Sequence, residues 1–185
     1  CDVVLSKDHE VIVFHDYSLK RLCNLEKNVA EMHSNELRQI NLLDTKSKIP
    51  TLEEMFYQVN SRVPILIEIK SGFNPIIEER LVELTRTYQG EVAFQSFDQK
   101  ACEWFRDNAS YYNTGLIISS NEIKKNTVKE LNIDFIAVDV NNIESMDVQE
   151  LRKNKLPTLT WTINNDEKLK FCLLYTSDAA DDLLC

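Results

Sequence analysis

The sequence is short of glycine, which argues against one large class of nucleotide-binding site. Only three glycines occur in 185 residues, and none belongs to a glycine-rich loop that follows an apolar run. Such a loop is needed where the backbone closely approaches a phosphate at the start of a helix. We therefore do not expect a dinucleotide site of the Rossmann type.

Long apolar runs and clusters of basic residues are also absent. No apolar run approaches the about 20 residues that a helix needs to cross a bilayer, so we expect no transmembrane segment in this chain. The formal net charge is −9, and no run of lysine or arginine offsets it. This argues against nucleic acid as a partner and favours a small-molecule substrate. The oligomeric state is left open.

Cysteine spacings typical of metal sites are missing as well. The five cysteines are scattered and odd in number. We interpret them as free thiols, which favours a reducing compartment such as the cytoplasm. The sequence opens at Cys1 with no initiator methionine, signal peptide or leading turn, so we expect it to be a piece of a longer protein.

What the chain does contain is a regular alternation of short apolar runs and helix-like segments, at intervals of about 20–27 residues from the third run onward. This pattern predicts βαβ units and a parallel sheet. The runs are Val3–Leu5, Val11–Phe14, Ile65–Ile69, Val92–Phe97, Gly115–Ile118, Phe135–Val140 and Pro157–Ile163. A doubly wound sheet and a (β/α) barrel both fit. The absence of a phosphate loop favours the barrel, so we predict an α/β fold of the (β/α)8 TIM-barrel class, incomplete, with about six of its eight βα units.

Local signals predict several helix ends. Thr51 and Glu54 have the capping-box spacing at the start of a helix. Gly90 is expected to end the next helix, which starts at Asn74-Pro75. A polar, helix-leaning insert of about residues 17–48 follows the second run, and within it Ser34 is expected to cap a short helix.

Polar side chains stand at the ends of several runs, where α/β folds place their chemistry. We assign Asp2 to the carboxyl end of the first strand, and His15 directly follows the second run. Glu68 and Lys70 share one face of the third run, about 7 Å apart. Carboxylates suit a hard cation, lysine suits a phosphate oxygen, and histidine suits proton transfer, a set appropriate to phosphate-ester hydrolysis. The alternatives are a partly exposed histidine and a structural Glu68–Lys70 ion pair.

These residues belong to an ordered set of motifs that resembles the glycerophosphodiester phosphodiesterase family, a group of metal-dependent (β/α)8-barrel hydrolases. The motifs run from the first residue to about Phe171: Asp2-Val3, Leu5–Asp8, Val13–Asp16 with Leu19 and Arg21, Ile49–Glu54, Ile67–Lys70, Gln95–Phe97 and Trp161–Asn164. The resemblance implies that Asp2 and Glu68 bind a divalent cation, Mg²⁺ or Ca²⁺, and that His15 is one of two catalytic histidines. It also implies that Lys70, Ser96 and Trp161 bind substrate, with Trp161 as an apolar wall; a core position is the alternative for Trp161.

The activity implied for the intact parent protein is hydrolysis of glycerophosphodiesters to glycerol 3-phosphate and an alcohol. A lysophospholipase D-like enzyme and a non-catalytic barrel that acts as a binding module are the alternatives. Family members also have an upstream strand ending in His-Arg-Gly, a glutamate two residues before the position of Asp2, and a further last strand. The 185-residue chain contains none of these, so we expect it to be inactive by itself.

The end of the chain departs from the family. The segment from Cys172 to Asp182 resembles a translated sequencing adapter. We therefore interpret residues 1–171 as a partial barrel domain and residues 172–185 as a non-native tail. A genuine helix C-terminus that packs Leu173 and Leu174 inward is the alternative.

Overall fold

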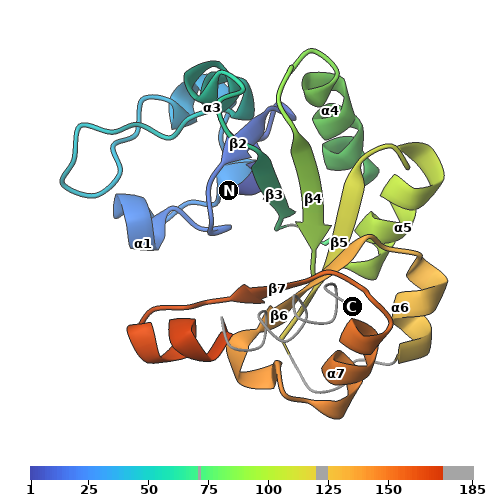
Figure 1. The fold of residues 1–185 in the computed structure, drawn as a ribbon. Helices are drawn as coiled ribbons and strands as arrows, with labels where there is room; N and C mark the ends of the chain where they lie inside the picture. The colour runs from blue at the N-terminus through green and yellow to red at the C-terminus, as the bar shows by residue number, and fades with distance from the viewer. Residues whose placement is uncertain (71, 120–124, 173–185) are drawn as a thin grey trace. The chain divides into compact units, whose positions relative to one another are not determined.

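The computed structural model describes residues 1–70, 72–119 and 125–172 (Figure 1). The chain divides into two compact units, Cys1–Gly115 and Leu116–Cys185. Strand β5 (Asn113–Ile118) crosses the boundary between them. None of the helices in the described part of the chain is long and apolar enough to cross a membrane.

The first unit is built on a mixed sheet. Its strands are β1 (Asp2–Leu5), β2 (Val11–Val13), β3 (Ile65–Ile69) and β4 (Val92–Ser96). Strand β1 pairs in parallel with β3, and β3 pairs in parallel with β4. The second run departs from the predicted parallel arrangement, because β2 is antiparallel to β1. The chain reverses through a tight turn closed by a hydrogen bond from Ser6 N to Glu10 O, whereas a parallel neighbour would need a crossover of a dozen or more residues.

The helices of the first unit follow the predicted order. The insert contains α1 (Lys20–Cys23), the 3₁₀ helix η1 (Val29–Glu31) and α2 (Ser34–Leu37). Longer helices follow as α3 (Leu52–Val59), α4 (Pro75–Thr85) and α5 (Gln99–Asn108). The small helical insert after the second strand is thus confirmed.

Two of the predicted helix ends are wrong and one is confirmed. The Thr51 hydroxyl accepts from Glu54 N, which completes the capping box of α3. Residue His33, not Ser34, occupies the N-cap of α2, because the Ser34 hydroxyl instead donates to Asp8 Oδ2 at 2.8 Å. Helix α4 ends at Thr85, with Arg86 as its C-cap, well before Gly90.

The alternation of side chains along β3 separates core from site. Ile65, Ile67 and Ile69 are buried in one apolar cluster with residues of α3, α4 and α5. Each such side chain contributes about 1.5–3 kcal/mol by its removal from water. Glu68 faces the opposite side of the sheet because successive strand residues alternate. In Figure 1, β3 and β4 lie side by side, with α4 and α5 beyond them.

The second unit continues the alternation of strands and helices. Strand β6 (Phe135–Asp139) pairs in parallel with β7 (Thr158–Trp161). The helices are α6 (Lys125–Leu131), the 3₁₀ helix η2 (Val140–Asn142), α7 (Met146–Lys153) and the helical residues 166–172. Cys172 is buried beside Val140 and Ile143. The predicted non-native tail lies outside the described residues apart from Cys172.

Candidate active site

The register of the sheet brings the predicted site residues together. Asp2 lies opposite Glu68 across the β1–β3 pair, so the start of β1 meets the end of β3. Phe14 directly follows β2, and its N donates to Asp2 O at 3.0 Å. The end of β2 therefore lies beside Asp2. The sequence predicted this meeting for another reason, that each residue stands at the carboxyl end of a parallel strand. That reason is wrong for Asp2, the first residue of β1, and for His15, which follows an antiparallel strand.

The Lys70 ammonium lies at the centre of the group. Its Nζ is 2.7 Å from Glu68 Oε1, 3.4 Å from Asp2 Oδ1 and 3.2 Å from His15 Nε2. Burial acts to lower the pKa of Lys70, but the carboxylates of Glu68 and Asp2 outweigh it, so the pKa is raised. Lys70 therefore carries a full positive charge between two carboxylates, and the structural ion pair considered from the sequence is present.

The hydrogen bonds of His15 assign its tautomer. A lysine ammonium can only donate, so His15 Nε2 accepts from Lys70 Nζ. The proton must then be on Nδ1, which lies 2.6 Å from Asp16 Oδ1 and donates to it. In this tautomer the Nε2 lone pair faces the ammonium of Lys70, beside the carboxylates.

An arginine fixes the carboxylate that orients His15. Arg21 donates from Nε to Asp16 Oδ2 and from Nη2 to Asp16 Oδ1, each at 2.7 Å. Hydrogen bonds from Arg21 and then from His15 lower the pKa of Asp16 to about 2. A nucleophile or base oriented by a third group is the arrangement on which histidine catalysis depends. Sequence reasoning predicts no role for Asp16 or Arg21, although the adjacency of His15 and Asp16 is a usable signal.

The oxygen donors at this edge of the sheet fit a hard cation. Glu68 Oε1 is inaccessible to solvent and has no aligned hydrogen-bond donor, although it pairs electrostatically with Lys70. Asp2 places a second carboxylate beside it. Carboxylate oxygens are the ligands that Ca²⁺ and Mg²⁺ prefer. Among the described residues, no cluster of three or more histidine, cysteine, aspartate or glutamate side chains is arranged to hold a metal.

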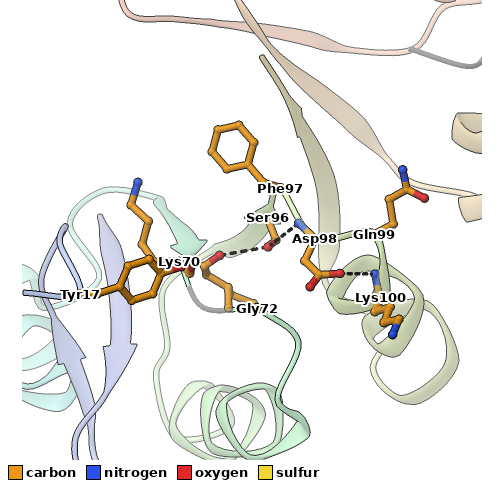
Figure 2. Close-up of a pocket in the computed structure, with 9 residues that line it drawn as sticks. Tyr17, Lys70, Gly72, Ser96, Phe97, Asp98, Gln99 and Lys100 are labelled. Atoms are coloured by element: carbon orange, nitrogen blue, oxygen red, sulfur yellow. Dashed lines mark hydrogen bonds between the residues drawn. The ribbon is translucent and has the colours of Figure 1, made fainter. Parts of the chain in front are cut away.

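A pocket of about 560 Å³ opens beside Lys70 at the ends of β3 and β4 (Figure 2). It is lined by Tyr17, Ile69, Lys70, Gly72 and residues 96–100. The Tyr17 hydroxyl donates to Lys70 O and holds the start of the insert against the end of β3. The sequence offered no specific signal for Tyr17.

Ser96 lines this pocket but uses its hydroxyl within the protein. The hydroxyl donates to Ile69 O at 3.0 Å and accepts from Asp98 N at 3.1 Å. Asp98 in turn caps α5 by accepting from Lys100 N and also accepts from Phe73 N. Ser96 therefore ties the end of β3 to the loop that starts α5. Its predicted role in substrate binding stays a prediction, and this geometry favours a positioning role.

Trp161 belongs to the second unit. It is the last residue of β7, and its indole Nε1 donates to Ala137 O at 3.1 Å. Its predicted role as an apolar wall for substrate therefore stays a prediction.

The chain matches the model of the glycerophosphoryl diester phosphodiesterase family over residues 1–180. The chain belongs to this family. A glycerophosphodiester phosphodiesterase of Caldanaerobacter subterraneus is 25% identical over 181 residues, which cover 91% of this chain and 74% of that protein. The predicted family and its class of activity, phosphoric diester hydrolysis, are thereby confirmed.

Solved structures show the same fold. The glycerophosphodiester phosphodiesterase of Thermotoga maritima is 27% identical, with a TM-score of 0.75 over 91% of this chain and 74% of that one. An Oleispira antarctica phosphodiesterase in complex with its product sn-glycerol-3-phosphate has a TM-score of 0.78 and 19% identity over 92% of this chain and 74% of that one. These likenesses confirm the predicted fold class, an incomplete (β/α)8 barrel.

Proposed function

We propose that the intact protein hydrolyses glycerophosphodiesters to glycerol 3-phosphate and an alcohol, with a divalent cation held by Asp2 and Glu68. The observation that carries this proposal is the convergence of two carboxylates and an imidazole nitrogen on the Lys70 ammonium, each within 3.4 Å of Nζ. The family match and the product complex of the Oleispira relative support it.

Each residue has a defined task in this scheme. Asp2 and Glu68 would hold the cation, and the charged Lys70 would bind a phosphate oxygen. His15 Nε2 is unprotonated, so it accepts a proton from the attacking hydroxyl, either water or a hydroxyl of the glycerol moiety. The new oxygen–phosphorus bond forms as the bond to the alcohol breaks, and the alcohol takes a proton from a second acid. Attack by water gives glycerol 3-phosphate directly, whereas attack by the glycerol hydroxyl gives a cyclic phosphate that a water molecule then opens to glycerol 3-phosphate. Asp16 and Arg21 keep the imidazole in this tautomer. A bound Mg²⁺ or Ca²⁺ supplies polarisation of the phosphate.

The test is a product assay on the intact parent protein. Glycerophosphocholine should give glycerol 3-phosphate and choline in equal amounts, and EDTA should abolish the release until Ca²⁺ or Mg²⁺ is returned. Release of lysophosphatidic acid from lysophosphatidylcholine, with no turnover of glycerophosphocholine, would replace this proposal with a lysophospholipase D activity. Binding of glycerol 3-phosphate without any turnover would make the barrel a binding module.

A further inference from the structure

Three polar side chains lie in one row across the sheet of the first unit. Asp2 of β1 pairs with Glu68 of β3, and Glu68 pairs with Gln95 of β4. Paired residues on neighbouring parallel strands project from the same face, about 4.8 Å apart. The neighbours of Gln95 along its strand, Phe94 and Ser96, are buried and face the other way. Gln95 therefore directs its carboxamide to the face that carries the two carboxylates.

The carboxamide oxygen of Gln95 is unpaired within the described part of the protein. Its Oε1 is inaccessible to solvent and has no hydrogen-bond partner among the described residues. The neighbouring Glu68 Oε1 is inaccessible as well, and it pairs with the Lys70 ammonium at 2.7 Å. Buried polar atoms are nearly always paired with protein, water or an ion, so an unpaired oxygen in such a place indicates a missing partner. The unpaired oxygen of Gln95, on the strand next to the Glu68 carboxylate, therefore indicates that this face holds a further ligand.

We propose that Gln95 supplies a third oxygen to the cation site formed by Asp2 and Glu68. This inference rests on the proposed function and adds to it a ligand of neutral charge. Amide oxygens are ordinary ligands of Ca²⁺, which takes 6–8 oxygens at about 2.3–2.6 Å. A cation held there would take one oxygen from each of three adjacent strands. A neutral third ligand also leaves more of the ion's charge for the phosphate than a carboxylate would.

Calorimetric titration of the 185-residue chain with CaCl₂ alone tests this assignment without any need for catalysis. Gln95→Met keeps the length of the side chain and removes the oxygen, so it should weaken Ca²⁺ binding by at least about 10-fold. Gln95→Glu replaces the amide oxygen with a charged one and should tighten binding. Gln58→Met makes the same exchange at an exposed position of α3 and should leave the affinity unchanged. Circular dichroism shows whether each variant is folded.

The outcomes separate this inference from the function on which it rests. If Asp2→Asn weakens Ca²⁺ binding and neither Gln95 variant differs from the Gln58→Met control, Gln95 is not a ligand and the two-carboxylate site stands. If the unsubstituted chain binds no Ca²⁺ at millimolar concentration, both the proposed carboxylate site and the proposed third ligand are wrong. Damage to the fold would weaken binding in both Gln95 variants, whereas the ligand role requires shifts of opposite sign. Should Gln95→Met fail to fold, tighter binding by Gln95→Glu supports the role and unchanged or weaker binding overturns it.

Discussion

The clearest quantitative prediction concerns Glu78, a carboxyl buried in the first turn of α4. Its exposed fraction is 0%, and neither of its oxygens has a hydrogen-bond partner among the described residues. Burial, and then the negative charges of Asp98 and Glu79, raise its pKa from 4.5 to about 7. The folded protein therefore holds a proton on Glu78 over a range of pH in which the unfolded chain has lost it.

The sign of the effect follows from proton linkage. Because the folded state binds the proton more tightly, the contribution of Glu78 is most favourable below pH 4.5 and declines as the pH rises towards about 7. At about 1.4 kcal/mol per pH unit, this rise in pKa corresponds to a loss of about 3 kcal/mol in the free energy of unfolding. That is a large part of the about 5–15 kcal/mol that stabilises a typical domain.

The substitution that removes this loss is Glu78→Met, which has similar length and no titrating group. Urea unfolding should be followed by tryptophan fluorescence and circular dichroism at pH 4.5, 6, 7 and 8, in buffers of constant ionic strength. The variant should gain about 3 kcal/mol over the unsubstituted chain between pH 4.5 and pH 8. Packing differences affect the offset between the two curves but not this change with pH.

Glu103→Gln is the matched control, since Glu103 is an exposed residue in the middle of α5. Its stability should follow that of the unsubstituted chain within about 0.5 kcal/mol at every pH. A stability difference between Glu78→Met and the unsubstituted chain that stays constant from pH 4.5 to pH 8 would refute the reasoning. It would mean that Glu78 is solvated or paired in the folded protein.

Three further predictions concern the site and the fold. In the intact protein, Glu68→Gln should weaken cation affinity by at least about 10-fold, and excess Ca²⁺ should restore part of the turnover. His15→Ala should lower turnover by about 10²–10⁴-fold, and added cation should not restore it. Rescue of the His15 variant alone would reverse the two assignments. Asp16→Asn removes the charged acceptor of the imidazole N–H, so it should lower turnover by at least about 10-fold and leave Ca²⁺ titrations unchanged; an altered titration would place Asp16 on the ion. Thr51→Ala removes the cap of α3 and should cost about 1 kcal/mol in urea unfolding, and no measurable loss would show that water replaces the hydroxyl.

Local sequence signals determined most of the secondary structure, because they act over a few neighbouring residues. The capping box at Thr51 and the apolar alternation of Ile65–Ile69 each predict an element without reference to the rest of the chain. The errors occur where a tertiary contact competes with a local preference. Ser34 is a good cap by type, yet its hydroxyl bonds to Asp8 from a distant turn, and His33 takes the cap position.

The sequence also determined which residue types meet at the site, because ordered motifs identify the family whatever the direction of a strand. It did not determine how they meet. Side-chain periodicity says which residues share a face, but it is the same for parallel and antiparallel strands and for every register of even offset. Only the tertiary structure decided that β2 returns antiparallel and that Asp2, Glu68 and Gln95 form one row. It also decided which polar atoms have no partner among the described residues, since the environments of Gln95 and Glu78 depend on strands and helices far away in the sequence.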